Sequence, residues 1–450
     1  MRISRVSAIV AAAALIAVVT GCAGGSGSSG SKTVNWWTWD DKQAAAYKTC
    51  ATAFEKANPG VTVDISQYNV DDYFTKLTAG FVAGDAPDAF QNSAQFFQSY
   101  ASLHQLQPLD DYIKADKFDL SRFSVGVNQW KYSDGQQYGL PLDWSAAGTY
   151  FNQTALTKAG YSAADVSKLN WNPDNGGTLG KMIAHLTIDD KGRRGDQPGF
   201  DKNHVKTYGF GEMAAKDFTG QTTWSPLLSS TGWRQGNTTM WPTRFNYDDP
   251  RFVKTMDWIR SLEDKGYIPK IGAFSDSVSD VELLSSGKVA MEIGGSWEAT
   301  TFAKIPNLKV GIAATPYGPD GKTRSVASGS NGNNIWAGSK NKDLAWKWIS
   351  YMGSEKCQTM ASASGSFFPS ISASMTAETN TFAKQGIDLS VFNDMLKDKT
   401  LYQGPVYANG QAVQSATEPL FEAYFAHQKN DDVFASMAEQ TKSLLAAKNQ

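Results

Sequence analysis

The residues best suited to chemistry surround Trp297, which closes the stretch Gly287–Trp297. Apolar spacing predicts a helix over 281–286, and alternating polarity predicts a short strand over 289–293. We expect Gly294–Gly295 to form a sharp turn that presents Trp297 where the strand ends. A Trp in that place offers a flat apolar plate to a sugar ring or another planar ligand. The alternative is a core Trp after an ordinary glycine turn.

Catalysis has little support in the sequence. A glycoside hydrolase needs two carboxylates that face each other across a bond. Helix caps or turns explain the three adjacent acidic pairs, since neighbouring side chains generally point to different places: Asp40/Asp41, Asp110/Asp111 and Asp189/Asp190. The four histidines lack metal-ligand spacing, and no P-loop, Gly-x-Ser-x-Gly or Cys-x-x-Cys motif occurs. We therefore expect no catalytic residue, no metal site and no cofactor.

The N-terminal sequence predicts an export signal. Arg2 and Arg5 precede an apolar segment over 8–19 that is too short to span a bilayer comfortably. It ends in Val19-Thr20-Gly21-Cys22, which resembles a bacterial lipobox. We expect a signal peptide over 1–21, lipidation of Cys22 and a flexible Gly/Ser-rich tether over 22–32. A plain secretory signal is the alternative.

Composition favours a binding protein over a partner of nucleic acids. The 450 residues suggest two lobes. Forty-two basic and 44 acidic residues leave a net charge of −2, and losing Arg2 and Arg5 with the signal leaves 40 against 44, or −4. The 14 Trp, 17 Tyr and 23 Phe exceed what an ordinary core needs, so some rings are expected to face a ligand. Apart from Cys22, the cysteines are Cys50 and Cys357, expected either to pair outside the cytoplasm or to be two buried thiols.

Strands and helices alternate from the start of the mature chain, as in a parallel α/β domain. Thr33–Trp39 reads as a strand, Asp40–Asp41 caps a helix that Asn58-Pro59-Gly60 ends, and Val61–Ile65 is a second strand. The other main elements expected are helices over 71–82, 179–186, 248–265 and 343–352 and from Asp431 onward, and strands over 149–151 and 310–313.

Seven motifs together resemble the extracellular solute-binding proteins of carbohydrate ABC importers, the maltodextrin-binding-like group. Each motif is weak alone, but they occur in order over nearly the whole mature chain. They are Val34-Asn35-Trp36-Trp37, Phe54–Val63, Gly84-Asp85-Ala86-Pro87-Asp88, Tyr138-Gly139-Leu140-Pro141, Tyr150-Phe151-Asn152, Gly287–Met291 with Gly294-Gly295-Ser296-Trp297, and Lys342–Ile349.

The resemblance implies a two-lobed periplasmic-binding-protein-like fold of type II, in the α/β class. Its discontinuous lobes are joined by a three-segment hinge and close over a ligand. We place the crossings near 140–147, 317–325 and 365–371. Lobe 1 is then 33–142 and 325–368, and lobe 2 is 143–324 and 369–450. Cys50 and Cys357 then share lobe 1, which favours the disulfide.

The resemblance also implies ligand contacts in the loops after strands. Aromatic rings would stack on apolar sugar faces, while carboxylate and amide groups would pair with hydroxyls. The residues carried over are Trp39, Asp40, Gln95, Phe96, Asp143, Trp144, Trp297, Glu298, Ser330 and Asn331, to which Trp224 and Tyr407 are added as cleft aromatics. Asp40 could merely cap its helix, and Trp224 could belong to the core.

The expected function is that of a receptor, not an enzyme. We expect it to capture a sugar, and specifically an oligosaccharide, and to deliver this sugar to a membrane permease. The alternatives are a secreted carbohydrate-active enzyme and a receptor for a non-sugar solute on the same fold. We expect a monomer held on a single-membrane bacterial cell by its lipid anchor, with no nucleic-acid partner. The aromatic run Trp36–Trp39 and the long segment 172–210 depart from a minimal member, so the sugar itself cannot be carried over.

Overall fold

The computed structural model describes residues 32–214, 218–274, 278–365, 367–385, 387–407 and 409–446. The residues from Thr33 onward form one compact unit. The signal peptide (1–21), Cys22 and all of the tether (22–32) except Lys32 lie outside the described residues. No helix in the described ranges combines the length and apolarity that a membrane span requires.

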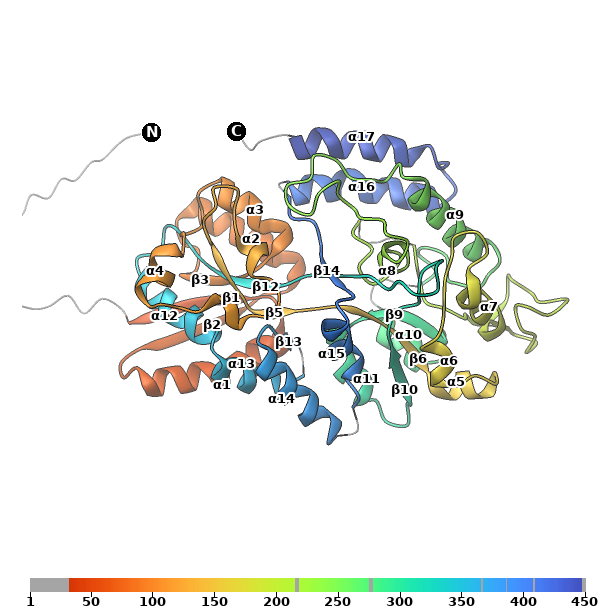
Figure 1. Cartoon of the computed structure of the whole chain (residues 1–450), viewed down its shortest axis with the longest axis horizontal. Helices are drawn as coiled ribbons and strands as arrows, with labels where there is room; N and C mark the ends of the chain where they lie inside the picture. Colours follow the sequence, from red (N-terminus) through yellow and green to blue (C-terminus); the bar gives the residue numbers. More distant parts are fainter. Residues whose placement is uncertain are drawn as a thin grey trace, which may run out of the picture. The chain divides into compact units, whose positions relative to one another are not determined.

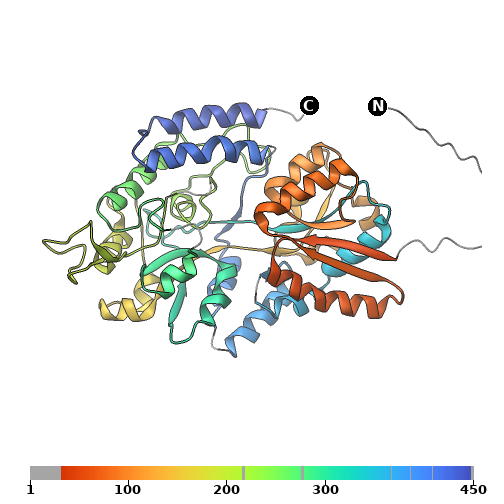
Figure 2. The same cartoon turned by 180° about the vertical axis from the view of Figure 1, so that it is seen from behind.

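The first lobe is built on a five-stranded sheet with the order β2-β1-β3-β12-β4. β1, β2 and β3 run parallel, whereas β12 lies antiparallel to both β3 and β4. Helices cover both faces, as Figures 1 and 2 show. The strands are β1 (Thr33–Thr38), β2 (Thr62–Gln67), β3 (Ala89–Ser93), β4 (Gly139–Pro141) and β12 (Asn331–Ile335). The helices are α1 (Asp41–Ala57), α2 (Val70–Ala83), α3 (Ala94–Ser102), α4 (Asp110–Ala115), α12 (Lys342–Met352) and α13 (Glu355–Ser362), with 3-10 turns η1 (Leu120–Arg122) and η2 (Val127–Trp130).

The side chains of β1 alternate between two hydrophobic cores, one on each face of the sheet. Val34, Trp36 and Thr38 are fully buried, and Val34 and Trp36 pack in a core with residues of α1, α12 and α13. Asn35 is exposed and Trp37 half-buried on the other face, where a second core joins α2, α3 and β3. α1 begins as expected, because the Asp40 side chain accepts the backbone N–H of Gln43 at 2.8 Å.

Cys50 on α1 and Cys357 on α13 form a disulfide, with their Cα atoms 5.3 Å apart. Both side chains are fully buried in the core shared by α1, α12 and α13. The bridge therefore joins two helices of the same lobe through cysteines that are 307 residues apart in sequence.

The second lobe is built on the antiparallel sheet β10-β6-β9 and a larger hydrophobic core. Its strands are β6 (Ala147–Asn152), β9 (Met291–Gly295) and β10 (Val310–Ala313), with the pair β7 (Ile188–Asp189) and β8 (Val205–Thr207). The 3-10 turn η3 (Ser296–Glu298) follows β9. The remaining described helices are α5 (Gln153–Lys158), α6 (Ala163–Val166), α7 (Gly177–Leu186), α8 (Ser225–Ser229), α9 (Pro250–Asp264), α10 (Asp280–Ser285), α11 (Ala299–Ala303), α14 (Ser372–Ala383), α15 (Ser390–Lys397), α16 (Gly410–Phe425) and α17 (Val433–Ala446).

Gly294–Gly295 does not form the sharp turn that the sequence suggests. Both glycines belong to β9, which pairs with β6, and Gly295 has an extended backbone with φ −79° and ψ 152°. The glycines are needed for close packing: a Cβ on Gly294 would lie 2.8 Å from a ring carbon of Tyr150. β9 therefore starts and ends two residues later than expected, and Trp297 sits in η3.

Short strands join the lobes at the centre of Figure 1. β5 (Asp143–Trp144) pairs with β13 (Phe368–Pro369), and β11 (Val326–Ser328) pairs with β14 (Leu401–Gln403). Tyr317 still pairs with Asn170, and Val326 packs in the second core. The chain therefore returns to the first sheet at 329–330, a few residues after the expected crossing. The full residue ranges of the lobes stay a prediction.

Candidate functional site

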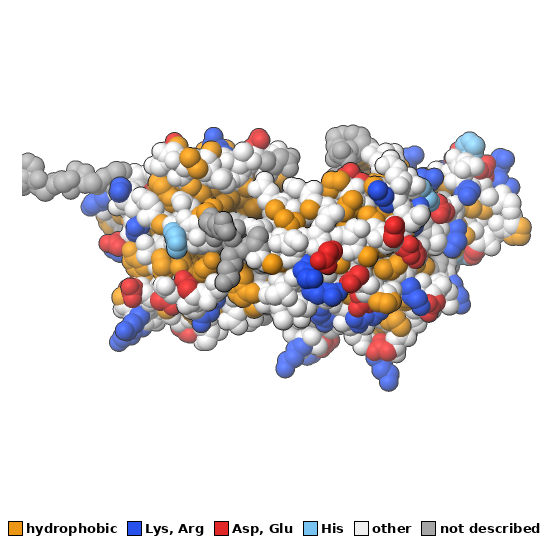
Figure 3. All heavy atoms as spheres, turned by 90° about the horizontal axis from the view of Figure 1, so that it is seen from above, with side chains coloured by type: hydrophobic (Ala, Val, Ile, Leu, Met, Phe, Trp, Pro, Cys, Tyr) orange, Lys and Arg blue, Asp and Glu red, His pale blue; other side chains and the backbone are white. Residues whose placement is uncertain are grey.

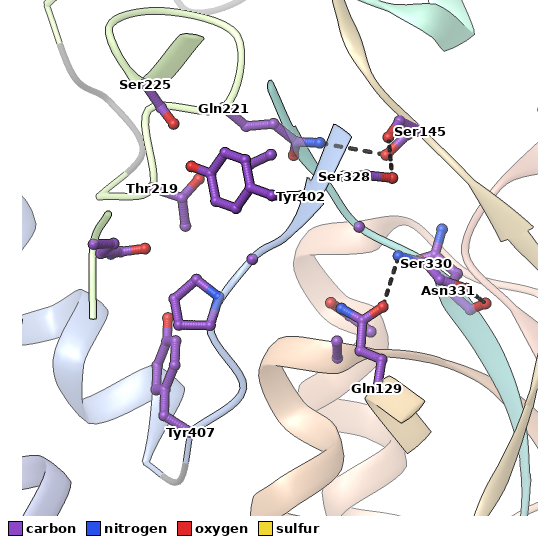
Figure 4. A pocket seen from close by; sticks show the side chains of 17 residues that line it. Gln129, Ser145, Thr219, Gln221, Ser225, Ser328, Ser330, Asn331, Tyr402 and Tyr407 are labelled. Atoms are coloured by element: carbon purple, nitrogen blue, oxygen red, sulfur yellow. Dashed lines mark hydrogen bonds between the residues drawn. The ribbon is translucent and has the colours of Figure 1, made fainter. Parts of the chain in front are cut away.

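A cavity of about 160 Å³ lies between the lobes, against the connecting segments (Figure 4). The first lobe contributes the end of β3, the start of α3 and η2; the second contributes α8 with the loop before it, Gln235, and β14 with the loop after it. The lining residues are Ser93, Ala94, Gln129, Ser145, Thr219, Gln221, Ser225, Gln235, Ala327, Ser328, Gly329, Ser330, Asn331, Tyr402, Gly404, Pro405 and Tyr407.

The described residues of the lining carry no charged side chain. They supply hydroxyls, carboxamides and two tyrosines, together with the small apolar side chains of Ala94, Ala327 and Pro405. Hydroxyls both donate and accept hydrogen bonds, and a carboxamide offers one group of each kind. A charged ligand would lose its hydration here without meeting an opposite charge, which is costly. The cavity therefore suits a neutral ligand rich in hydroxyl groups.

Hydrogen bonds fix several lining residues before any ligand arrives. The backbone N–H of Ser330 donates to Gln129 Oε1 at 3.0 Å. Gln221 Nε2 donates to Ser145 Oγ at 3.3 Å, and Ser328 Oγ donates to the Ser145 carbonyl at 3.0 Å. These bonds involve η2 and Ser330 next to the first sheet, Gln221 in the loop before α8, and the connecting segments at Ser145 and β11. Residues of both lobes and of the connecting segments therefore share hydrogen bonds along the cavity wall (Figure 4).

Two tyrosines supply the aromatic surface. The Arg234 guanidinium lies 4.0 Å from the centre of the Tyr402 ring, and the Tyr402 hydroxyl is 2.8 Å from Ser229 Oγ. Because Arg234 covers one face, the opposite face is the one on which a ligand ring can stack. Tyr407 packs edge-on against Phe245, with ring centres 4.9 Å apart.

Of the residues expected from sequence, Ser330, Asn331 and Tyr407 line this cavity. Asn331 lies at the start of β12, not in a loop after a strand. For Gln95 the structure describes the backbone position in α3 alone, directly after the lining residue Ala94.

The remaining expected residues of the first lobe do not line the cavity. Asp40 caps α1, and burial raises the pKa of its carboxyl above 3.8. Trp39 packs edge-on against Tyr73 at 5.2 Å, and Phe96 stacks on Phe74 at 4.0 Å. The structure thus gives these side chains capping and packing partners within the lobe.

Trp144 and Trp224 are core residues of the second lobe. Their side chains are 1% and 0% exposed. Trp144 packs against Phe368 at 5.1 Å, and Trp224 stacks on Phe421 at 5.9 Å. Neither lines the cavity, because the apolar core of this lobe takes up both rings.

Asp143 lies behind the cavity wall and is 3% exposed. It accepts hydrogen bonds from Gln43 Nε2 at 2.8 Å and from the Asn331 backbone N–H and Nδ2 at 3.0 and 3.1 Å. Burial raises the pKa of its carboxyl, while these bonds lower it in part. Asp143 therefore contacts residues that line the cavity but does not line the cavity itself.

Trp297 is the one expected tryptophan that is well exposed, at 39%. The backbone N–H of Ser296 donates to the Ala146 carbonyl at 2.9 Å, so the turn that carries Trp297 is bonded to the neighbour of Ser145. Lys42 Nζ lies 3.2 Å from Thr301 Oγ1, which joins α1 to α11 beside this turn. Trp297 thus lies near the cavity without lining it.

Glu298 is the next residue of that turn. Burial raises the pKa of its carboxyl from 4.5 to about 8, and repulsion from Asp280 adds to the rise. Burial also raises the pKa of the neighbouring Glu292 carboxyl, and Glu298 repels it.

Replacing Glu298 with glutamine is expected to raise the melting temperature at about pH 9 and to change it little at about pH 5. The folded state keeps a proton that the unfolded state releases between 4.5 and about 8. The stabilisation of the fold by protonated Glu298 is therefore fully present below pH 4.5 and is lost as the pH rises through about 8. Thermal denaturation at both pH values tests this, and equal shifts at the two would contradict it.

Sequence reasoning missed much of the cavity lining. Gln129 lies in a 3-10 turn, and Thr219, Gln221 and Gln235 lie in long irregular connections without a motif. Tyr402 lies on β14, a strand of three residues. The run Ser328–Gly329–Ser330 before a strand was the one local signal. A Cβ on Gly126, which has φ +90°, would lie 2.5 Å from Ser330 Oγ, so a glycine lets η2 approach this run.

The acidic pairs have structural roles. Asp189 accepts the backbone N–H groups of Lys191 and Arg193 within its turn, and Asp110 accepts that of Gln137 at 2.8 Å. Within the ranges that the structure describes, no three His, Cys, Asp or Glu side chains gather to hold a metal ion.

Comparisons with known proteins identify relatives that match this chain over most of its length. A binding protein of Brucella abortus is 24% identical over 414 residues, covering 90% of both chains. The maltodextrin-binding protein MdxE of Bacillus subtilis is 24% identical over 310 residues, 68% of this chain and 65% of that one. The ABC substrate-binding protein Lmo0181 of Listeria monocytogenes, solved in complex with cycloalternan, superposes with a TM-score of 0.77 at 20% identity, covering 92% of this chain and 98% of that one.

The fold is therefore that of two-lobed solute-binding proteins, as the sequence predicted. The family described as bacterial extracellular solute-binding protein matches residues 49–386. Because this match spans most of the sequence and both lobes, the chain belongs to the bacterial extracellular solute-binding proteins.

Proposed function

We propose that this protein is the receptor of an ABC importer, capturing a neutral sugar between its lobes and delivering it to a membrane permease. The observation that carries the proposal is the cavity lining, in which the described residues supply hydroxyls, carboxamides and two tyrosine rings but no charged side chain. Sugars present hydroxyls at their edges and apolar C–H groups on their ring faces. The lining offers a partner to each of these.

Several relatives of this chain are named for carbohydrates. One relative is named for maltodextrin and another, in Rhizobium radiobacter, for lactose. The similar Listeria protein was solved with cycloalternan. These three names describe neutral sugars, whereas a further relative, in Bacillus subtilis, is named for the acidic polymers polygalacturonan and rhamnogalacturonan. None of the described residues that line this cavity is charged, which favours the neutral class.

The size of the cavity bears on the length of the sugar. About 160 Å³ is less than the roughly 300–1,000 Å³ typical of pockets for larger ligands. We infer that the cavity takes one end of an oligosaccharide in this conformation. Further rings would extend toward Trp297 or require the lobes to separate about their hinge. Ser330, Asn331, Tyr402 and Tyr407 are the proposed contacts inside the cavity.

The proposed partner is a permease in the membrane of the same cell. Exposed apolar side chains Val70, Val82 and Leu103 lie on α2 and directly after α3. Figure 3, which looks down on the molecule from above Figure 1, shows apolar side chains across the half that holds the first lobe and more charges on the other half. Together with a signal peptide over 1–21 and a lipid on Cys22, this fits a monomer that works at the outer surface of the membrane.

The proposal is tested by calorimetry on the protein from Ser31 onward. The neutral panel is glucose, maltose, maltotriose, lactose and mannotriose; galacturonate, glucosamine and glutamate form the charged set. We expect a neutral sugar to bind and to be recovered unchanged, and the Trp297→Ala variant to bind it more weakly. Cleavage of the sugar would restore the enzyme alternative, and binding of the charged set alone would refute a neutral ligand.

A further inference from the structure

A chain of buried hydrogen bonds crosses the first lobe and ends at the cavity. Thr38 Oγ1 donates to Gln91 Oε1, and Gln91 Nε2 donates to Gln43 Oε1 at 2.8 Å. Gln43 Nε2 donates to Asp143 Oδ2 at 2.8 Å, and Asp143 accepts two bonds from Asn331. The side chains of Thr38, Gln91, Gln43 and Asp143 are at most 4% exposed.

The donors in this series of hydrogen bonds all point the same way, from Thr38 toward Asp143. Each amide accepts a bond at its oxygen and donates one from its nitrogen, and all the donors lead to the Asp143 carboxylate, which in its ionised form can only accept. Turning either glutamine amide around would set oxygen against oxygen or nitrogen against nitrogen inside the core, which is costly. Asp143 therefore sets the orientation of the groups bonded to it.

Asn331 is the member of the chain that reaches the cavity. Its Nδ2 is turned toward Asp143 Oδ2 at 3.1 Å, while its backbone N–H is held by Asp143 Oδ1 at 3.0 Å. With both nitrogens held by one carboxylate, the amide has a single orientation, and no described residue donates to Asn331 Oδ1. Ser330, the preceding lining residue, donates its hydroxyl to the Asp143 carbonyl at 2.7 Å.

We propose that Asp143 is a positioning residue that fixes the Asn331 side-chain oxygen as a hydrogen-bond acceptor for a ligand hydroxyl. The inference rests on the proposed function, since it concerns how that same cavity recognises its sugar. It differs from the sequence-based expectation of direct contact with the sugar, because Asp143 acts through Asn331 and Ser330.

The test compares Asp143→Asn with a matched variant, Asp88→Asn. Asp88 is also buried, at 6% exposed, and accepts the backbone N–H and Nδ2 of Asn35 at 3.0 and 3.2 Å. It directly precedes β3, whereas the lining residue Ser93 ends that strand. Both variants therefore disturb a buried carboxylate that is bonded to an asparagine backbone N–H and side-chain amide, but only Asp143 is bonded to residues that line the cavity.

Two measurements are made on each protein. NMR follows hydrogen exchange of the Asn331 side-chain NH₂, which we expect to be protected in the wild type and in Asp88→Asn but not in Asp143→Asn. Calorimetry uses each neutral sugar of the panel above. Asp143→Asn is expected to weaken binding about 10- to 100-fold and Asp88→Asn to leave it unchanged.

A pH titration of the wild type keeps the test informative if Asp143→Asn does not fold. The Asn331 NH₂ signal should move as Asp143 takes up a proton on acidification; Asp40 and Tyr47 are the titratable groups that face Asp143. An Asn331 NH₂ that exchanges freely, or whose signal is unmoved by acid, overturns the positioning role whether or not a sugar binds. If the signal behaves as expected but no panel sugar binds, the proposed function fails and the positioning of Asn331 stands.

Discussion

Replacing Cys50 and Cys357 together with alanine lowers the free energy of unfolding by about 2–5 kcal/mol. The bridge closes a loop of 307 residues, so its loss frees a large part of the unfolded chain from a constraint. It also leaves two small voids where α1 and α13 pack together in the first lobe. Urea denaturation of the variant and the oxidised wild type measures the difference.

Reduced wild-type protein serves as the control, since it should lose a similar amount of stability without any change of side chain. Sugar binding at low denaturant should be retained, because neither cysteine lines the cavity. A difference below about 0.5 kcal/mol would show that the disulfide constrains the unfolded chain little.

Replacing Tyr402 with alanine weakens binding of a neutral sugar by about 100-fold or more. The ring supplies an aromatic surface to the cavity between the lobes, and Arg234 and Ser229 hold it in place. Its removal takes away the stacking surface and leaves the Arg234 guanidinium without its aromatic partner. Calorimetry with the neutral sugar that binds the wild type measures the loss.

Tyr402→Phe is the matched control. It keeps the ring and removes only the hydroxyl bonded to Ser229, so binding should weaken by less than about tenfold. If Tyr402→Ala binds the sugar as tightly as the wild type and Tyr402→Phe do, the ring does not stack on the ligand. If both lose binding to the same degree, the hydroxyl is the contact that matters.

The sequence predicted the elements whose own residues determine them. Alternation in Thr33–Trp39 gave the buried and exposed faces of β1, and Asp40 marked the start of α1 because a carboxylate accepts the free N–H groups there. β12 was harder to predict, because Asn331, Asn333 and Asn334 are polar residues in a central strand. Their partners lie elsewhere in the chain: Trp36 Nε1 donates to Asn333 Oδ1 at 2.8 Å, and Asn334 Nδ2 donates to the Tyr138 carbonyl at 2.8 Å.

The cavity depends still more on tertiary structure. Sequence shows that Trp144, Trp224 and Trp297 exist, but burial decides that the first two belong to the core and leaves the third exposed. Ser330 and Asn331 were found through the resemblance, whereas Gln221 and Tyr402 come from segments about 180 residues apart that no local pattern connects. The same holds for Asp143, whose bonds to Gln43 and Asn331 could not be read from spacing.

The most direct test of the central claim is a crystal structure of the protein with the neutral sugar that binds most tightly in the calorimetric panel. We predict a sugar ring in the cavity between the lobes, stacked on Tyr402, with a hydroxyl donating to Asn331 Oδ1 and further contacts to Ser330 and Tyr407. A sugar bound elsewhere on the protein, with this cavity holding only water, would contradict the account.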